Sequence, residues 1–230
     1  MKYSMLWKRA VCSVMAVSML ATSALAWTVN KQDLTEVEVK FEEDVNVGPS
    51  DWAKAEVDAA TKAGLLPKLT DNPAYTDAIT REQFAELVVQ SVEVMLDREL
   101  DTAPEDTFSD SSNPSVRKAS QAGIVSGVGE GKFEPKTTTN REQIAAMIFR
   151  AIRYVEKESG TVIAPNAGSL AGFTDQSQVS SWAVEGVGTL AANHIMSGTS
   201  ATTLSPSKDC TVEESILLCY RVYDRFVNAQ

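Results

Sequence analysis

The sequence predicts an all-α protein, built from three helix-loop-helix repeats that form a pseudo-threefold bundle around three central helices. Thr80, Asn140 and Thr211 each start a similar stretch of sequence. Each is a favourable N-cap, and a Gln or Glu three residues later can accept a hydrogen bond from the cap's own N–H. The starts lie 60 and 71 residues apart, from 80 to 140 and from 140 to 211. Such spacing indicates an internal repeat.

An apolar stripe with a period of about 3.6 residues follows each start and predicts an amphipathic helix. A two-helix unit cannot bury such a stripe alone, so we expect three units to bring their longer helices to a common axis. The stripes are Phe84, Leu87, Val88, Ser91, Val92 and Met95; then Ile144, Met147, Ile148, Ala151, Ile152 and Val155; then Ser215, Leu218, Cys219, Val222, Tyr223 and Phe226.

Residues 1–26 predict an export signal that is removed from the mature chain. Lys2, Lys8 and Arg9 precede an uncharged apolar segment that ends in the A-x-A pattern of residues 24–26. A membrane anchor is the competing interpretation, but the uncharged run is short for a span and contains Ser and Thr. Cleavage removes three basic residues and no acidic ones, which changes the formal net charge from −10 to −13. A chain this acidic is not expected to bind nucleic acid or anionic lipid.

The rest of the chain divides into an acidic lead-in and the three units. Residues 36–41 of the lead-in alternate like one short strand. The predicted segments are 1–26 for the signal peptide, 27–48 for the lead-in, and 49–99, 105–158 and 170–228 for the repeats. From Ile124 to Asn140 the second repeat aligns without a gap with the third, from Ile195 to Thr211, at a constant offset of 71.

Each repeat also has a shorter first helix. Glycine favours the left-handed conformation that ends many helices. The three predicted helices run from Ser50 or Asp51 to Gly64, from about Pro114 to Ala122 before Gly123, and from Ser181-Trp182-Ala183 to about Asn193, where His194 takes the place of the glycine. We therefore expect His194 to be a turn residue and not a catalytic base.

The two cysteines of the mature chain, Cys210 and Cys219, are nine positions apart. In one helix that is about 13 Å, too far for a disulfide. Cys219 lies on the apolar stripe and is expected in the core. Cys210 precedes the helix cap, so we expect it to be exposed and available for reaction or for pairing between chains. The adjacent Glu213 and Glu214 are expected to be solvated.

An ordered set of short motifs resembles the S-layer homology (SLH) family, over residues of about 49–228. In the first repeat the motifs are Asp51-Trp52-Ala53, Ala63-Gly64-Leu65 and Ile79-Thr80-Arg81-Glu82. In the second they are Phe108-Ser109-Asp110, Ala122-Gly123-Ile124-Val125-Ser126-Gly127, Phe133-Glu134-Pro135 and Asn140-Arg141-Glu142. In the third they are Phe173-Thr174-Asp175, Ser181-Trp182-Ala183, Ser197-Gly198, Leu204-Ser205-Pro206 and Thr211-Val212-Glu213.

The resemblance implies grooves between neighbouring repeats that bind a secondary cell-wall polysaccharide, often pyruvylated, and hold an exported protein non-covalently at the cell wall or S-layer. The family's main anion contact corresponds to Arg81 and Arg141. A pyruvate ketal presents a carboxylate, which a guanidinium can meet with two parallel hydrogen bonds. Both arginines begin a helix, where free N–H groups and the dipole would also favour an anion.

Four further residues are candidates for the ligand site. Trp52 and Trp182 offer flat surfaces for sugar rings, although a tryptophan on a helix more often packs in a core. Gly127 and Gly129 would let backbone N–H groups approach the ligand. The arginines could equally be solvated residues that contribute little.

The repeats depart from the family pattern, and this leaves a second class of function open. Val212 stands where the third arginine would be, Ser111 where a tryptophan would align, and Pro67-Lys68-Leu69-Thr70 where the first repeat would have its glycine loop. Grooves altered in this way could bind surface-layer proteins in place of glycan. An enzyme is not expected, because about 20 residues lie outside the repeats and no catalytic set, metal cluster or cofactor motif is recognisable.

Overall fold

The structure is a computed structural model that describes residues 48–230. Within this range the chain forms six α-helices and one short 3₁₀-helix, with isolated β-bridges but no strand. This confirms the predicted all-α fold. No helix in the described range is long and apolar enough to cross a membrane. The predicted signal peptide and the short strand of residues 36–41 lie outside the described residues.

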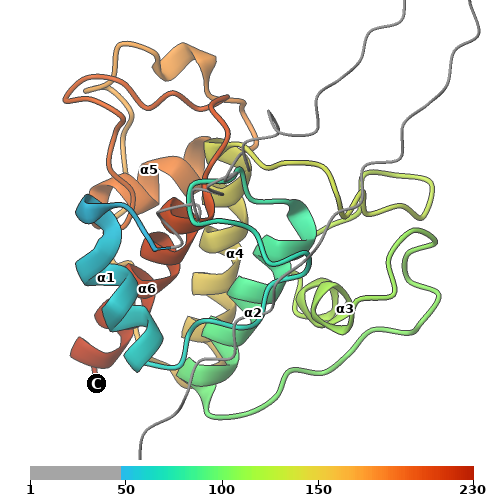
Figure 1. Cartoon of the computed structure of the whole chain (residues 1–230). Coiled ribbons are helices and arrows are strands. Elements are labelled where there is room, and N and C mark those ends of the chain that lie inside the picture. Colours follow the sequence, from blue (N-terminus) through green and yellow to red (C-terminus); the bar gives the residue numbers. More distant parts are fainter. Residues whose placement is uncertain (1–47) are drawn as a thin grey trace, which may run out of the picture. The chain divides into compact units, whose positions relative to one another are not determined.

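The three long helices begin where the sequence predicts and pack against one another in the centre (Figure 1). They are α2 (Arg81–Leu96), α4 (Arg141–Ser159) and α6 (Val212–Asn228). All three have a complete capping box, formed by Thr80 with Gln83, Asn140 with Gln143, and Thr211 with Glu214. The buried faces of these helices include every residue of the predicted apolar stripes except Tyr223, which is half-buried and packs against the core. Hydrophobic burial around one axis therefore joins segments far apart in the chain.

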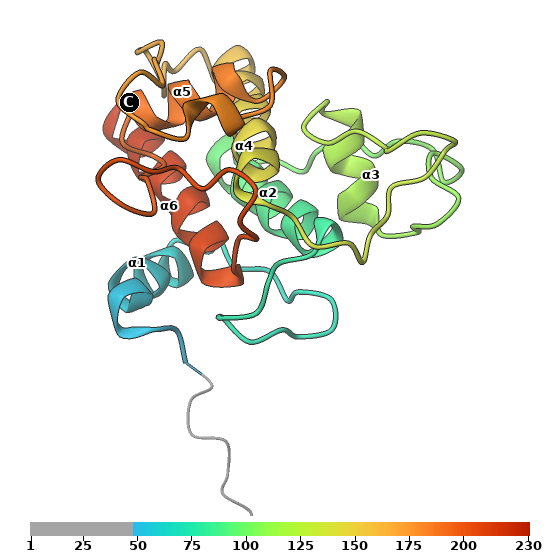
Figure 2. The ribbon, with the colours of Figure 1, turned by 90° about the horizontal axis from the view of Figure 1, so that it is seen from above.

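Each short helix packs against the long helix of the preceding unit, and not against the long helix that follows it in its own unit. Thus α3 (Pro114–Gln121) lies on α2, α5 (Val184–Ala192) lies on α4, and α1 (Asp51–Lys62) closes the cycle on α6 (Figure 2). His194 adopts the left-handed φ of 54° that Gly64 and Gly123 adopt at the other two helix ends, so its role as a turn residue is confirmed. Helix α5 begins later than predicted, because Trp182 lies in the turn before it.

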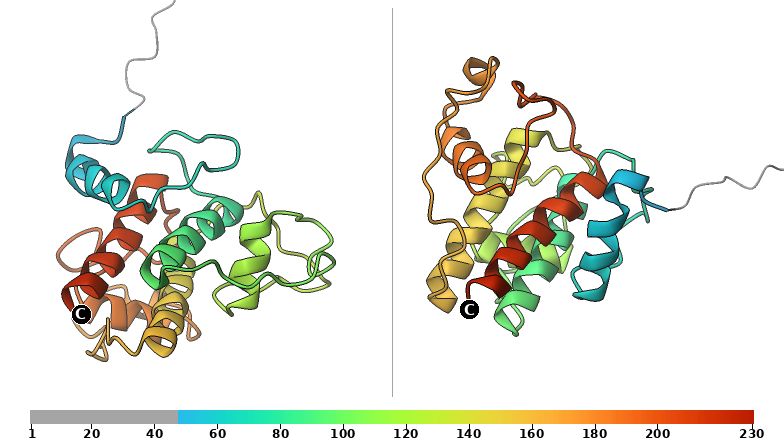
Figure 3. Two further views of the ribbon diagram at one scale, coloured as in Figure 1. Left: turned by 90° about the horizontal axis from the view of Figure 1, so that it is seen from below. Right: turned by 90° about the vertical axis from the view of Figure 1, so that its left-hand side faces the viewer.

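A closed ring of backbone hydrogen bonds joins the segments that enter the long helices. The Ile79 N–H donates to the Cys210 carbonyl at 2.9 Å, the Cys210 N–H to the Thr139 carbonyl at 2.9 Å, and the Thr139 N–H to the Ile79 carbonyl at 3.0 Å. Every unit thus contributes one donor and one acceptor, and the ring fixes the pseudo-threefold relation of the three units. Figure 3 shows from two further directions how the short helices surround the long ones.

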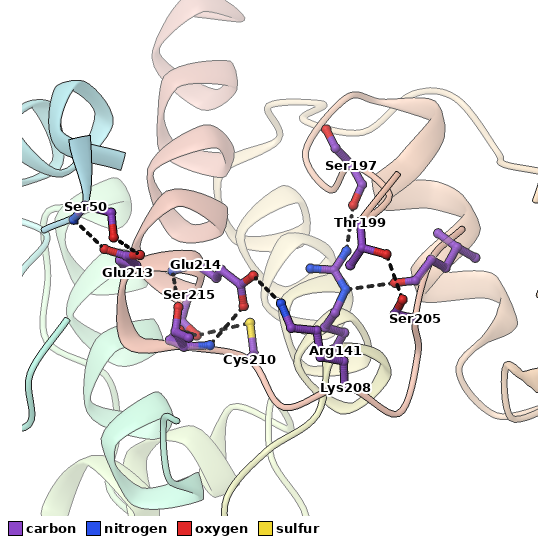
Figure 4. Close-up of polar contacts among 12 residues, drawn as sticks. Ser50, Arg141, Ser197, Thr199, Ser205, Lys208, Cys210, Glu213, Glu214 and Ser215 are labelled. Carbon is purple, nitrogen blue, oxygen red and sulfur yellow. Dashed lines mark hydrogen bonds and ion pairs between the residues drawn. The ribbon is translucent and has the colours of Figure 1, made fainter. Parts of the chain in front are cut away.

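Three residues in the last helix or just before it are buried. Cys219 is 3% exposed and lies in the core, as predicted, and both cysteines are free thiols. Cys210 was expected to be exposed, which is wrong: it is fully buried, because its backbone belongs to the hydrogen-bonded ring. Glu213, expected to be solvated, is 3% exposed and accepts hydrogen bonds from the N–H and Oγ of Ser50 at 2.9 and 2.8 Å (Figure 4). It fastens the start of α1 to α6.

Candidate ligand grooves

Two grooves on the body contain the same types of residue at corresponding positions. We call them the Arg81 groove, with a cavity of about 180 Å³, and the Arg141 groove, with a cavity of about 250 Å³. The Arg81 groove is lined by Arg81, Ser126, Gly127, Val128, Gln143, Ala146, Met147, Arg150 and Trp182. The Arg141 groove is lined by Arg141, Met196, Ser197, Gly198, Thr199, Lys208, Glu214, Leu217, Leu218, Arg221 and Trp52.

All three units contribute to each groove. In the Arg81 groove the arginine comes from the first unit, the loop at Gly127 and the face of α4 from the second, and Trp182 from the third. In the Arg141 groove every contribution moves on by one unit, so that the tryptophan is Trp52 from the first. The cyclic packing of the short helices produces this arrangement, since it carries each tryptophan beside the preceding long helix.

The two tryptophans are exposed, not part of the core. Trp52 is 60% exposed and Trp182 is 54% exposed, although large apolar side chains usually gain free energy by burial. Each lines a groove that also holds an arginine. An indole beside a cation and exposed loop backbone gives a surface that can stack on a sugar ring while polar groups meet its substituents.

The two arginines hold the loops of the neighbouring unit. The Arg141 Nε donates to the Leu204 carbonyl at 2.9 Å and its Nη2 to the Ser197 carbonyl at 2.6 Å (Figure 4). Arg81 makes the same two bonds in its groove, from Nε to Phe133 at 2.8 Å and from Nη2 to Ser126 at 2.9 Å. Arg141 is only 7% exposed, whereas Arg81 is half-buried. The arginines therefore support the fold as well as lining the grooves.

Arg81 is also in contact with an aromatic ring. Its guanidinium carbon lies 4.5 Å from the centre of the Phe133 ring, within the range of a cation–π interaction. Burial lowers the pKa of this guanidinium, opposed by the nearby charges of Glu134 and Asp110. An arginine remains charged despite such a shift, because its ordinary pKa is so high. The positive charge thus persists at the groove wall.

The helix starts are not open to an anion, contrary to the expectation from sequence. The Arg81 N–H donates to the Thr137 carbonyl at 2.9 Å, and the Arg141 N–H donates to the Lys208 carbonyl at 3.0 Å. The second N–H of each helix also meets a carbonyl of the next unit, and the third meets the capping side chain. Loop carbonyls thus occupy the positions that a carboxylate would need, so only side chains and loop backbone remain for a ligand.

The two candidate glycines have different surroundings. Gly127 lines the Arg81 groove, and a Cβ there would lie 2.7 Å from the Lys132 carbonyl oxygen and 2.9 Å from the Phe108 ring. The packing of the loop therefore requires it to be glycine. Gly129 has a φ of 114° and pairs with Lys132 in a turn, but it is not among the residues that line the groove. The structure does not bring it together with the other candidates.

The sequence reasoning missed three basic residues that line the grooves. Arg150 and Arg221 are 71 positions apart and occupy matching places on α4 and α6, and Lys208 lies on the loop before α6. The repeat offset that aligned the loops carries on through these helices and could have identified the arginine pair. Nothing in the motifs marks Lys208.

A third groove occupies the corresponding place between the third and first units, where Val212 replaces the arginine. This Val212 groove has a cavity of about 440 Å³ and is mainly apolar. Ser111, which aligns with the tryptophans, is 8% exposed and is not among its lining residues. The residues that line it are Leu66, Pro67, Lys68, Leu69, Asn72, Pro73, Ala74, Tyr75, Leu87, Val212 and Ile216.

Comparison with known sequences identifies the units that contain these loops. The family model for the S-layer homology domain matches residues 106–145 and 172–214. The chain carries S-layer homology domains. Both matches run from the loop before a short helix to the first turns of a long one. The SLH domain is a binding module known for cell-wall anchoring. Its presence implies a cell-surface or cell-wall location.

Part of the chain is similar to part of several carbohydrate-active enzymes. It is 30% identical over 110 residues to an amylopullulanase of Thermoanaerobacterium thermosulfurigenes, and these residues are 45% of this chain and 6% of that protein. It is 36% identical over 105 residues to an endoglucanase of Bacillus sp. (strain KSM-635), covering 42% of this chain and 11% of that one. It is 27% identical over 110 residues to the exoglucanase XynX of Acetivibrio thermocellus, covering 45% and 10%. The matched part thus spans only a small share of each of these relatives.

Proposed function

We propose that the chain is an exported protein that binds non-covalently to an acidic secondary cell-wall polysaccharide at the cell wall or S-layer. The observation that carries the proposal is the double occurrence of one arrangement. The Arg81 groove and the Arg141 groove are separate cavities with the same lining. Each is lined by an arginine, a Ser-Gly loop and an exposed tryptophan, which come from three different units. We infer that residues 49–99, 105–158 and 170–228 are three SLH repeats behind a signal peptide of residues 1–26 and a lead-in of residues 27–48.

The chemistry of the grooves suits an acidic sugar. A cavity of about 180 Å³ is well above the roughly 10–15 Å³ that one water molecule needs, so it has room for a ligand group much larger than water. The indole of Trp182 would stack on the ring, and the guanidinium of Arg81 would attract a carboxylate. Arg81 donates through Nε and Nη2 to loop carbonyls, while within residues 48–230 its Nη1 has no hydrogen-bond partner. A pyruvate ketal is one group that would supply such a carboxylate.

The test is co-sedimentation of a chain starting at Trp27 with purified cell walls, before and after chemical removal of their accessory polysaccharide. We expect binding only to the intact walls. The informative variant combines Trp52→Ala with Trp182→Ala, because both side chains are more than half exposed and their loss should not unfold the protein. Val162→Ala is a matched control, since Val162 is 59% exposed and lies outside the grooves. Binding that survives removal of the polysaccharide would contradict the proposal.

A second candidate function is assembly with surface-layer proteins, and the Val212 groove favours it. That groove has lost both the arginine and the tryptophan and is lined mainly by apolar side chains, as expected of a contact for protein rather than for charged glycan. Light scattering distinguishes the two functions. Concentration-dependent assembly without polysaccharide binding would favour this alternative, and a monomer at every concentration would count against it.

A further inference from the structure

Arg150 and Arg221 occupy matching positions in the two grooves but differ in their partners. Arg221 donates from Nε and Nη2 to both carboxylate oxygens of Glu56, at 2.7 and 2.8 Å, and from Nη1 to the Ile195 carbonyl at 3.2 Å. Arg150 is exposed, and its side chain makes no hydrogen bond or ion pair with any residue in the described range. One guanidinium is therefore bound within the protein, while the other is available.

The reason for the difference lies four residues after each tryptophan. Glu56 follows Trp52 by four positions on α1, and the residue four positions after Trp182 on α5 is Gly186. Both tryptophans precede the left-handed residue after the helix by 12 positions, so the two segments align without a gap. Gly186 faces α4 closely: a Cβ there would lie 3.3 Å from the Ala145 carbonyl oxygen. Gly186 therefore gives Arg150 no counterpart of the carboxylate that Glu56 supplies to Arg221.

The two grooves consequently differ in how many of their lining cations are paired directly with a carboxylate. The lining of the Arg81 groove has two cationic side chains, Arg81 and Arg150, and no carboxylate. The Arg141 groove has a lysine in addition to its two arginines, but Glu214 lies 3.3 Å from Lys208 and Glu56 neutralises Arg221. Within the described residues, that leaves one cation without a direct carboxylate partner in the Arg141 groove, Arg141, against two in the Arg81 groove. Asp110 and Glu134 lie close enough to act on the charge of Arg81, but the partners of its guanidinium are the carbonyls of Phe133 and Ser126 and not these carboxylates.

We propose that Arg150 is a second anion-binding residue and that it makes the Arg81 groove the tighter site for an acidic saccharide. Arg221 instead holds α1 against α6. The inference rests on the proposed wall-binding function and adds which groove carries most of it. An exposed, unpaired guanidinium can form new charge-assisted hydrogen bonds, whereas one already paired to a carboxylate would first have to give up that partner.

The test compares the charge-removing variants Arg150→Gln and Arg221→Gln in the same wall-binding measurement, with Lys157→Gln as the control. Lys157 is an exposed residue of α4 outside both grooves, so its loss removes the same charge without touching a site. We expect Arg150→Gln to weaken binding about tenfold, as the loss of a charge-assisted contact predicts. Arg221→Gln should bind within about twofold of the unchanged chain but melt at a lower temperature.

A further variant tests the same idea by gain of binding. Glu56→Gln releases Arg221 from its carboxylate, and we expect it to bind walls several-fold more tightly through the Arg141 groove. The inference would be overturned if Arg150→Gln bound as well as Lys157→Gln, or if Arg221→Gln lost as much affinity as Arg150→Gln. Either result leaves the proposed function intact as long as the unchanged chain binds. Absence of wall binding by the unchanged chain would instead refute the proposed function itself.

Discussion

The Nη2 of Arg141 donates to the carbonyl of Ser197 at 2.6 Å, and this bond joins the start of α4 to the loop of the next unit. Together with the bond from Nε to Leu204, it occupies one edge of the guanidinium. A residue placed by family resemblance at a ligand site is thus also part of the framework that shapes the site. We therefore expect its substitution to lower stability and, if the groove binds a ligand as proposed, binding as well.

Arg141→Ala is accordingly expected to lower the free energy of unfolding by about 2–3 kcal/mol, because it leaves two loop carbonyls without their charged donor at a buried site. Arg81→Ala should cost less, about 1–2 kcal/mol, since Arg81 is only half-buried and water can reach its partners. Urea unfolding of both variants measures the difference. Equal losses, or no loss for Arg141→Ala, would contradict the structural role of the bonds.

Gly127→Ala tests whether the groove loop depends on the missing side chain. The added Cβ would approach the Lys132 carbonyl oxygen to 2.7 Å, so the loop must shift. We expect a loss of about 1–3 kcal/mol in the free energy of unfolding, the usual cost of overpacking. Gly172→Ala is the matched control, because Gly172 has no positive φ and a Cβ there would meet no atom within 4 Å. A Gly127→Ala variant as stable as the control would show that the loop can adjust freely.

The long helices could be predicted from sequence because their signals are local. A cap, a glutamine or glutamate three residues on and a 3.6-residue stripe lie within one stretch of chain, and the structure places all three helix starts there. The partners of the helix-start N–H groups could not be predicted in this way. Thr137 and Lys208 supply those carbonyls from other units, and only the cyclic packing brings them into place.

The burial of Cys210 could not be predicted from the sequence either, because it too depends on residues of other units. Its neighbours in the chain are polar, but its backbone lies in the hydrogen-bonded ring, where it is bonded to Thr139 and Ile79 of the other two units. The missed pair of Arg150 and Arg221 is a different case. The repeat offset of 71 does connect these two residues, but each is an ordinary surface arginine until the fold sets a tryptophan from another unit beside it.

The cysteines provide a test of the closed bundle. Burial raises the pKa of both the Cys210 and the Cys219 thiol to about 12, so the reactive thiolate is scarce at neutral pH. A chain starting at Trp27 should therefore not react with a thiol reagent at pH 8 while folded, and both cysteines should react once denaturant is added. Ser200→Cys adds an exposed thiol as a positive control. Rapid labelling of Cys210 in the folded protein would mean that the ring opens.

The last prediction concerns acid stability and rests on Asp175. Its carboxylate accepts hydrogen bonds from the N–H groups of Leu204, at 2.9 Å, and Ser205, at 2.8 Å, and so holds Ser205 at a positive φ of 51°. The Leu204 N–H is the main cause that lowers the pKa of Asp175 in the folded protein; burial opposes it and the Ser205 N–H assists it. In the unfolded chain an aspartate titrates at about 3.9.

Because the folded pKa is the lower one, the contribution of Asp175 to stability is complete above about pH 4 and is lost as the pH falls through the folded pKa. Asp175→Asn should therefore lower the melting temperature most at pH 7, and the gap to the unchanged protein should narrow below about pH 4. Asp224→Asn is the control, since Asp224 is exposed on α6 and its side chain makes no hydrogen bond or ion pair within residues 48–230. A gap that stays constant from pH 7 to pH 2 would show that the charge of Asp175 does not hold the loop.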